Sequence, residues 1–229
     1  MSSKISLITG ANGGLGTYVT QAMLDAGFTV IGLAPRIKQS DFTHPNFTML
    51  PASLDTQEVA RKAVDEVLKK FGKIDILVHT VGGFSGGQPL HATDHATFQR
   101  MFDLNVNAAF HILRAVIPHM REAQTGRIIG IGSRAGEIPA ATIGAYSASK
   151  AAFESLMRTV ALENKDAGIT ANIILPGTID TPANRQAMPG ADTSQWVKPS
   201  TIASLIVWLA RDAGTDVNGA AIPVYGAAL

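Results

Sequence analysis

The chain has 229 residues, of which 46% are hydrophobic and only 16% are charged. Average globular proteins carry about 25% charged residues, and the apolar content here excludes an intrinsically disordered chain. The 19 basic and 18 acidic residues leave a net charge of +1, which gives no electrostatic reason to expect binding to nucleic acid or to an anionic membrane. The absence of cysteine excludes disulfides, thiol nucleophiles and cysteine-ligated zinc.

No apolar stretch approaches the roughly 18 residues of a membrane span. The first residues lead directly into an apolar run that ends at Thr9 and Gly10, too early for a cleavable signal peptide. From these two observations we expect a soluble, cytoplasmic protein. Because the chain shows no linker, repeat or low-complexity tract, we also expect a single domain over residues 1–229.

Short apolar runs alternate with helical patterns along the chain. Strands are expected at 5–8, 28–33, 47–50, 75–78, 127–131, 170–175 and 221–224. Helices are expected at 14–26, 55–71, 97–120, 146–167 and 200–210, and Asp55 with Glu58 is a capping pair for the second. Strands that are apolar on both faces and alternate with helices indicate a parallel sheet covered on both sides. The predicted fold is α/β, a Rossmann-like doubly wound, mainly parallel sheet of about seven strands in a single domain.

A glycine-rich turn, from Thr9 to Gly16, follows the first expected strand. Glycines permit a tight turn and let backbone N–H groups approach a pyrophosphate at the N-terminus of a helix. This is the position at which parallel sheets bind dinucleotides. The alternative is a glycine-rich loop without a ligand, because such a turn alone is weak evidence.

Tyr146 and Lys150 are four residues apart, so on a helix they share one face. A nearby cation favours the phenolate and lowers the pKa of a tyrosine, which suits it to general acid–base catalysis. Ser133 follows the fifth expected strand, where its hydroxyl could orient a substrate carbonyl. An isolated pair of this kind is usually an exposed helical pair, but here it accompanies the glycine turn and a serine at the end of a strand.

These motifs resemble those of the short-chain dehydrogenase/reductase family over almost the whole chain. Thr9-Gly10, Gly14 and Gly16 match its TGxxxGxG turn, and Ser133, Tyr146 and Lys150 match its catalytic serine and YxxxK motif. Asn105 matches an asparagine associated with a water relay to the lysine. Pro176-Gly177 matches the PG motif that follows the sixth strand.

The resemblance implies hydride transfer between a nicotinamide cofactor and a carbonyl or alcohol. Tyr146 would protonate the carbonyl oxygen, Lys150 would bind the nicotinamide ribose, and Ser133 would polarise the carbonyl, while Asn105 would anchor the proton relay. The implied cofactor site comprises Gly10, Asn12, Gly14, Leu15, Gly16, Arg36, Ser53, Leu54, Val81, Gly82, Tyr146, Lys150, Pro176, Gly177, Ile179 and Thr181. The alternative class is a non-catalytic NAD(P)-binding sensor on the same fold.

Some positions depart from the family pattern. His79 begins the segment in which the family usually has Asn-Asn-Ala-Gly, and we expect it to satisfy buried backbone groups rather than to transfer protons. Ser53 replaces the family aspartate beside the adenine-contacting residue, which puts the adenine contacts in doubt. Ala34 occupies the position where NAD-specific members carry an acid, and Arg36 could pair with a 2′-phosphate. NADP(H) is therefore the favoured cofactor, and NAD(H) remains possible. The alternative role for Arg36 is that of a solvated loop cation that contacts no cofactor.

Two loops, at 82–87 and 180–196, resemble those of dihydropteridine reductase, a family member. A substrate lid is expected around 180–198, and Phe84, Met188 and Trp196 are candidate substrate contacts. The alternative role for Phe84 and Trp196 is packing of the lid against the domain. A ketone is the safer substrate class, because the chain has the catalytic serine, Ser133, that serves carbonyl chemistry. Dihydropteridine reductases prefer NADH and lack that serine.

No metal site is expected, because His91 and His95 have no third ligand nearby in sequence.

A homodimer or homotetramer is expected, because the helices at 97–120 and 146–167 carry apolar residues on more than one face, and the family pairs these helices across a two-fold axis. A monomer with an apolar surface is the alternative. The remaining partner is a small carbonyl or alcohol substrate.

Overall fold

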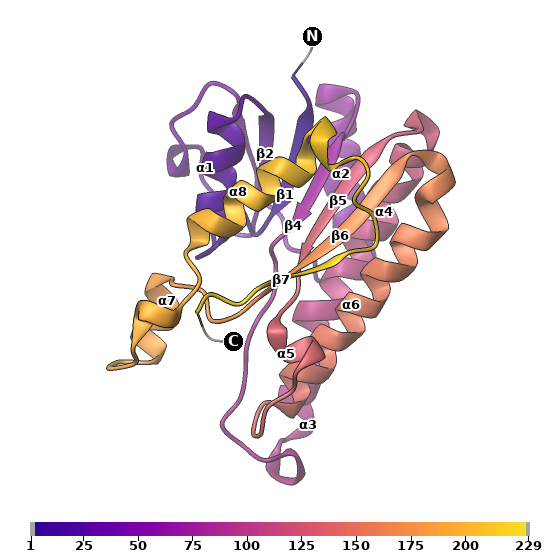
Figure 1. The fold of residues 1–229 in the computed structure, drawn as a ribbon. Helices are drawn as coiled ribbons and strands as arrows, with labels where there is room; N and C mark the ends of the chain where they lie inside the picture. Colours follow the sequence, from indigo (N-terminus) through magenta and orange to yellow (C-terminus); the bar gives the residue numbers. More distant parts are fainter. Residues whose placement is uncertain (1–2, 228–229) are drawn as a thin grey trace.

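A parallel sheet forms the centre of the computed structural model, which describes residues 3–227. Its strand order is β3-β2-β1-β4-β5-β6-β7, and every neighbouring pair is parallel (Figure 1). The strands are β1 (Ile5–Thr9), β2 (Thr29–Leu33), β3 (Phe47–Leu50), β4 (Ile76–His79), β5 (Gly126–Ile131), β6 (Ile169–Pro176) and β7 (Ala221–Val224). The strand order reverses between β1 and β4, the type of position where doubly wound sheets bind ligands.

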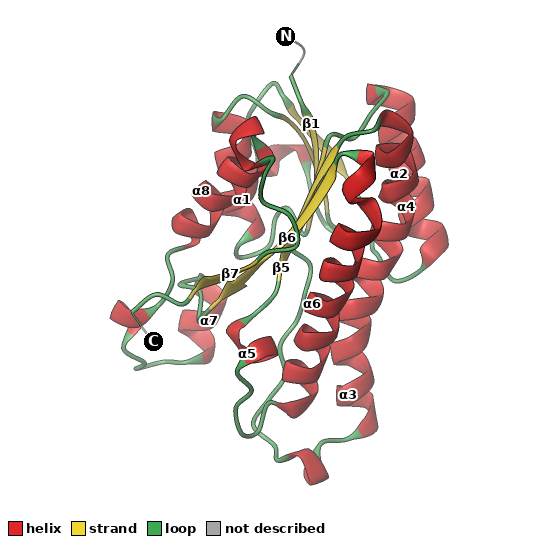
Figure 2. Cartoon of the chain, turned by 45° about the vertical axis from the view of Figure 1, so that its right-hand side comes forward, coloured by secondary structure: helices red, strands yellow, loops and turns green. Residues whose placement is uncertain are grey.

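Helices cover both faces of the sheet (Figure 2). One face carries α1 (Gly16–Asp25) and α8 (Pro199–Ala210), which pack against each other, and the other carries α2 (Gln57–Phe71), α4 (Ala108–Ala123) and α6 (Gly144–Asn164). The shorter helices are α3 (His95–Phe102), α5 (Arg134–Glu137) and α7 (Pro182–Ala187). Single turns occur at η1 (Gln39–Asp41), η2 (Leu90–Ala92), η4 (Lys165–Ala167), η5 (Thr193–Gln195) and η6 (Asp212–Gly214), and η3 (Asp103–Asn107) is a π-helical segment.

Each central strand is buried along its whole length, which explains its continuous apolar character. Neighbouring residues of a strand point to opposite faces, so Leu7 belongs to the core under α2, α4 and α6, whereas Ile8 belongs to the core under α1 and α8. The α/β, Rossmann-like, single-domain fold predicted from the sequence is confirmed, and the sheet is wholly parallel.

Two local expectations were wrong. Thr56, not Asp55, caps α2: its hydroxyl accepts a hydrogen bond from the Val59 N–H at 3.3 Å, so the side chain of Asp55 remains outside the helix. The helix expected at 97–120 is divided by the π-helical segment, a local widening that often accompanies a functional site.

The two long helices bury most of their apolar residues within the chain itself. Met101 and Met120 belong to the core, as do six other residues singled out in the sequence: Ala108, Ala109, Ile112, Leu113, Phe153 and Met157. Phe110 and Leu162 remain 45% and 71% exposed. Phe98 and Leu104 are also exposed, at 38% and 37%, so these helical segments keep apolar surface that another chain could cover. Within residues 3–227, no helix combines the length and apolar character that crossing a membrane requires.

Candidate active site

The glycine turn joins β1 to the N-terminus of α1 and can approach a ligand closely. Gly10 has a φ of +71°, and its N–H donates to the Leu33 carbonyl oxygen at 2.7 Å. A Cβ at Gly16 would collide with the Gly10 carbonyl oxygen, and one at Gly14 would lie 3.3 Å from Thr181 Cβ. Leu15 provides no side-chain cap at the start of α1, although the Thr17 N–H already donates to the Gly13 carbonyl oxygen at 3.0 Å. These features suit a pyrophosphate at the helix N-terminus.

Two polar residues interact beside this turn: Asn12, which was expected there, and Asp41, which the sequence analysis missed. Asn12 Nδ2 donates to Asp41 Oδ2 at 3.1 Å, and the same oxygen accepts the Lys38 N–H at 3.1 Å. Arg36 is exposed and has no hydrogen bond or ion pair among the described residues. A cation and a carboxylate thus both lie in the segment that follows β2.

Ser133, Tyr146 and Lys150 come together at the carboxyl end of β5. Ser133 Oγ accepts the Ala135 N–H at 3.2 Å, which starts α5, and the Ser133 hydroxyl is close enough to Tyr146 to lower the pKa of its phenol. Lys150 Nζ lies 6.0 Å from the centre of the Tyr146 ring and donates to the Ile131 carbonyl oxygen at 3.0 Å. The arrangement gives an acid–base group, a hydroxyl donor and a buried ammonium within one site.

Burial decides the ionisation of this site. It raises the pKa of the Tyr146 phenol, and the neighbouring Ser133 hydroxyl acts in the opposite direction. It also lowers the pKa of the Lys150 ammonium to about 8. The expectation that Lys150 lowers the tyrosine pKa is therefore wrong for this structure, because desolvation dominates and the ammonium donates to a backbone carbonyl.

Asn105 joins the loop after β4 to α6. Its Oδ1 accepts the Gly83 N–H at 2.9 Å, and its Nδ2 donates to the Gly83 carbonyl oxygen at 3.0 Å and to Ser149 Oγ at 2.9 Å. A Cβ at Gly82 would lie 2.8 Å from Asn105 Oδ1 and 3.1 Å from Lys150 Nζ. The asparagine therefore fixes the backbone directly beside the lysine. Ser149 was missed because its hydroxyl lies inside the Tyr-x-x-x-Lys motif without being part of it.

His79 is buried beside the lysine. Its Nδ1 lies 2.9 Å from Thr9 Oγ1, and its Nε2 has no partner among the described residues. The expectation that it satisfies backbone groups is wrong, since its one hydrogen bond is to a side-chain hydroxyl. Burial and the Lys150 cation lower its pKa to about 3, so the imidazole is neutral.

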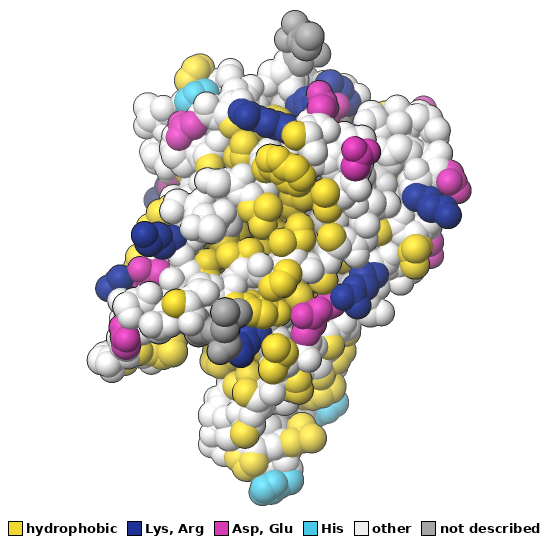
Figure 3. All heavy atoms as spheres, viewed as in Figure 1, with side chains coloured by type: hydrophobic (Ala, Val, Ile, Leu, Met, Phe, Trp, Pro, Cys, Tyr) yellow, Lys and Arg dark blue, Asp and Glu magenta, His cyan; other side chains and the backbone are white. Residues whose placement is uncertain are grey.

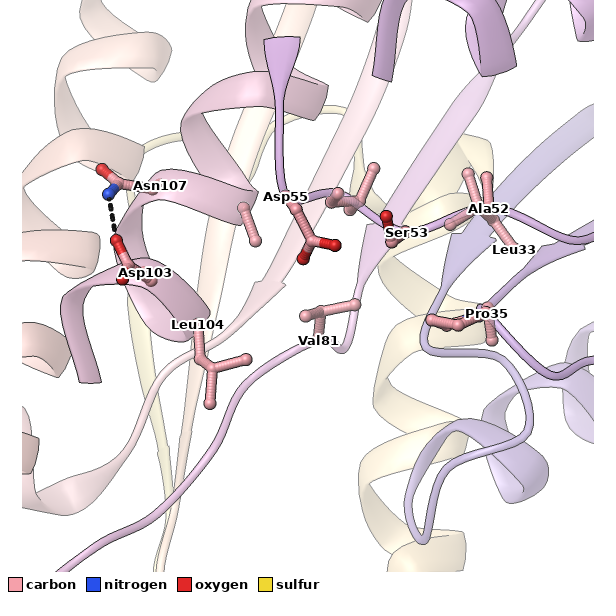
Figure 4. A pocket seen from close by; sticks show the side chains of 12 residues that line it. Leu33, Pro35, Ala52, Ser53, Asp55, Val81, Asp103, Leu104 and Asn107 are labelled. Carbon is pink, nitrogen blue, oxygen red and sulfur yellow. Dashed lines mark hydrogen bonds between the residues drawn. The ribbon is translucent and has the colours of Figure 1, made fainter. Parts of the chain in front are cut away.

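A cavity of about 410 Å³ opens at the carboxyl ends of β2, β3 and β4, and we call it the strand-end cavity (Figure 4). It contains three of the predicted cofactor residues, Ser53, Leu54 and Val81. Ala34, which the sequence analysis linked to cofactor choice, also lines it. The other lining residues were not expected at a cofactor site, because they lie in segments far apart in the sequence: Leu33, Pro35, Ala52, Asp55, Asp103, Leu104, Asn107 and Ala108. A pocket of this size suits part of a dinucleotide.

The segment after β6 closes over the glycine turn. Gly177 donates its N–H to the Val224 carbonyl oxygen at 2.9 Å, Ile179 bridges to Val197, and Thr181 caps α7 close to Gly14. Pro176 is the last residue of β6. Of these predicted cofactor residues, Thr181 lies next to the predicted pyrophosphate position.

The candidate substrate residues are only partly brought together. The Phe84 ring meets the Tyr146 ring edge-on, with 5.0 Å between their centres, although Phe84 is 65% exposed. Met188 and Trp196 lie in the segment 180–198, and the described ring contacts do not include Trp196. Phe84 is thus the candidate that contacts the tyrosine.

Among residues 3–227, no group of three or more His, Asp or Glu side chains is arranged to hold a metal ion. His91 and His95 lie on two different elements, η2 and α3, rather than on one helix.

The chain is similar to known proteins over nearly its full length. A sequence model of the family described as short chain dehydrogenase matches residues 4–192. The 2-(R)-hydroxypropyl-CoM dehydrogenase of Xanthobacter autotrophicus is 29% identical, with 98% of each chain covered. The cyclic-di-GMP-binding biofilm dispersal mediator protein of Escherichia coli is 32% identical, with 99% of this chain and 97% of the relative covered.

Solved structures show the same fold. The crystal structure of gox2181 has a TM-score of 0.90 at 26% identity and covers 98% of this chain and 95% of its own. ElxO with NADP bound has a TM-score of 0.93 at 22% identity, with 98% of each chain covered, which supports the fold alone. With the family match spanning most of the sequence and the parallel sheet in place, the chain belongs to the short-chain dehydrogenase family and is an NAD(P)-dependent oxidoreductase.

Proposed function

We propose that the chain interconverts a carbonyl and an alcohol, with Tyr146 as the general acid and base. The observation that carries this proposal is the buried ammonium of Lys150, 6.0 Å from the centre of the Tyr146 ring, with Ser133 beside the phenol. A bound reduced nicotinamide supplies the hydride. The phenol of Tyr146 gives its proton to the carbonyl oxygen, and Ser133 holds and polarises that oxygen.

Lys150 and Asn105 are proposed to support this step. The ammonium of Lys150 would bind the nicotinamide ribose. Asn105 would keep the backbone at Gly83 in place and anchor the path by which a proton returns to the tyrosine.

We propose NADP(H) as the favoured cofactor, with NAD(H) possible. The pyrophosphate would bind at the glycine turn (Gly10, Asn12, Gly14, Leu15 and Gly16), the adenosine end in the strand-end cavity, and the nicotinamide carboxamide beside Ile179 and Thr181. Arg36 supports a 2′-phosphate because it is exposed and unpaired among the described residues. Asp41 is the feature that would instead favour an unphosphorylated ribose.

The substrate is proposed to be a small ketone or alcohol that enters between Phe84 and a lid formed by residues 180–198. A quinonoid dihydropterin is the second candidate, favoured by the contact between the exposed Phe84 ring and Tyr146, since a flat heteroaromatic ring could stack there. Met188 and Trp196 would contact it from the lid. Ser133 favours the ketone, because a hydroxyl donor serves carbonyl chemistry.

The test is oxidation of NADPH and NADH by the purified chain with ketones, a 3-oxoacyl thioester, quinones and quinonoid dihydropterin. Turnover with one of the carbonyl compounds supports the proposal. Tight cofactor binding without turnover on any of them, together with binding of cyclic di-GMP, would instead favour the non-catalytic sensor suggested by the name of the Escherichia coli relative.

A homodimer or homotetramer remains part of the proposal. Phe110 and Leu162 are exposed on α4 and α6, and hydrophobic side chains also gather on the face formed by α8 and β7 (Figure 3). Trp208 on α8 is 44% exposed. Apolar surface of this kind favours contact with another chain. The cytoplasmic location stays a prediction from the sequence.

A further inference from the structure

His79 has a buried ring nitrogen that the proposed reaction does not use. The side chain is 1% exposed, its Nδ1 lies 2.9 Å from Thr9 Oγ1, and its Nε2 has no partner among the described residues. Burying a polar nitrogen without a hydrogen bond costs free energy, so the ring is expected to serve another group nearby.

The sheet directs this nitrogen toward the lysine of the active site. His79 on β4 pairs with Thr9 of β1 on one side and with Gly130 of β5 on the other. Nδ1 faces Thr9, so Nε2 is turned away from β1 and toward the side of β5. On that side the Lys150 ammonium donates to the carbonyl oxygen of Ile131, the residue after Gly130, at 3.0 Å.

Phe153 on α6 packs against both groups. The centre of its ring lies 5.7 Å from the centre of the His79 ring and 5.9 Å from Lys150 Nζ. The titratable side chains beside the ammonium are His79 from β4 and Tyr146 from α6. Asn105 from η3 and the backbone carbonyl from β5 are its uncharged polar neighbours. The imidazole and the ammonium thus share one buried environment.

The ammonium decides which ring nitrogen carries the proton. A neutral imidazole has one N–H. Either tautomer leaves one donor unpaired among the described residues: the Thr9 hydroxyl if Nδ1 is protonated, or the ring N–H if Nε2 is protonated. A buried cation repels an N–H that points toward it and attracts a lone pair. The tautomer with the proton on Nδ1 is therefore favoured, and it turns the Nε2 lone pair toward Lys150.

We infer that His79 is a positioning residue, whose Nε2 lone pair faces the Lys150 ammonium and helps to hold it charged and in place. The inference rests on the proposed role of Lys150 at the nicotinamide ribose and adds a residue that prepares the lysine for that role. An acceptor beside a buried cation stabilises the charged form against the desolvation that favours the neutral amine.

Two substitutions separate the two ring nitrogens. His79→Gln keeps an acceptor near the position of Nε2, whereas His79→Asn keeps one near the position of Nδ1. The measurement is the affinity for NADPH against pH, followed by fluorescence of the reduced nicotinamide without substrate. In wild-type protein the affinity should fall with a midpoint at about pH 8, where Lys150 loses its charge.

The midpoint should stay there in His79→Gln and should move down by about one pH unit in His79→Asn, because loss of the acceptor favours the uncharged lysine. Titration of the 2′-phosphate of the ligand is common to the three proteins and cancels in the comparison. An unchanged or higher midpoint in His79→Asn, or equal shifts in the two variants, would overturn the inference. A role confined to the Thr9 contact would give the reverse pattern, with His79→Gln altered and His79→Asn close to wild type.

The tautomer provides a second readout that needs no cofactor. Long-range proton–nitrogen NMR correlations of the wild-type protein, with the His79 signals assigned by their loss in His79→Gln, should place the ring proton on Nδ1. A proton on Nε2 would overturn the inference and leave the proposed function standing. Affinity that is independent of pH in all three proteins would instead contradict the proposed role of Lys150 at the cofactor, and the inference would fall with it.

Discussion

The ammonium of Lys150 lies 6.0 Å from the centre of the Tyr146 ring and donates its hydrogen bond to the Ile131 carbonyl oxygen. The two residues are one helical turn apart on α6, so their spacing is fixed by the helix. Burial raises the pKa of the tyrosine and lowers that of the lysine to about 8. The protein therefore holds a protonated phenol beside an ammonium that titrates near neutral pH, a state suited to carbonyl reduction.

This ionisation predicts the pH dependence of reduction. The proposed reaction needs a protonated Tyr146 and a charged Lys150, and the charge on Lys150 is lost as the pH rises through about 8. The value of kcat/KM for the reduced cofactor in ketone reduction, which reports the cofactor-free enzyme, should therefore fall above that pH. Lys150→Arg should be slower but should lack this decline, since a guanidinium stays charged. A wild-type profile that stays flat to pH 10 would contradict the assignment.

The hydrogen bonds of Asn105 should contribute to stability. Asn105→Ala leaves the N–H and carbonyl of Gly83 without their partner, and a buried unpaired group costs about 1–3 kcal/mol. We expect the free energy of unfolding in urea to fall by that amount. Asn107→Ala is the control, because Asn107 only donates to Asp103 in an exposed pair, and it should cost less than about 0.5 kcal/mol. Equal losses in the two variants would argue against a special role for Asn105.

Cofactor choice should depend on Arg36. If its guanidinium pairs with the 2′-phosphate, Arg36→Ala should weaken NADPH binding by about 10- to 100-fold and change NADH binding by less than about threefold. Lys38→Ala, which removes an exposed cation two residues away, should leave both affinities close to wild type. Tighter binding of NADH than of NADPH by the wild-type protein would indicate instead that Asp41 beside Asn12 selects the ribose hydroxyl.

Sequence reasoning predicted the sheet and the main cluster because both depend on local patterns. Buried strands such as β1 and β6 are apolar on both faces, and Tyr146 and Lys150 are tied by helical spacing. The short helices α5 and α7 were missed, because four and six residues are too few to show a period. Their starts are visible only as capping hydroxyls, on Ser133 and Thr181.

Other parts of the site depend on contacts between distant segments. Asp41 meets Asn12 across 29 positions of sequence, and Asp55 meets Asp103 only as walls of one cavity, so no local pattern points to either. The direction of the Tyr146 pKa shift also could not come from spacing. It follows from the burial of the ring and from the choice of Ile131 as the partner of the lysine.

The proposed assembly predicts a mass in solution of at least twice the 24.1 kDa of one chain. If α4 forms the two-fold contact, Phe110→Asp should lower the mass, because a charge would enter an apolar interface. Met49→Asp is the matched control, since Met49 is exposed on β3, the edge strand at the opposite end of the sheet from β7, and it should leave the mass unchanged. Light scattering that gives 24.1 kDa at micromolar concentration would refute the oligomer.

The most direct test of the proposed chemistry is the turnover of Tyr146→Phe on the best carbonyl substrate, measured alongside its affinity for the reduced cofactor. The variant keeps the ring that contacts Phe84 and loses only the hydroxyl beside Ser133. General acid–base catalysis contributes about 10²- to 10⁴-fold, so turnover should fall by at least about 100-fold while the dissociation constant of the cofactor changes by less than about threefold. Turnover within a few fold of wild type would show that Tyr146 is not the proton donor and would contradict the proposed mechanism.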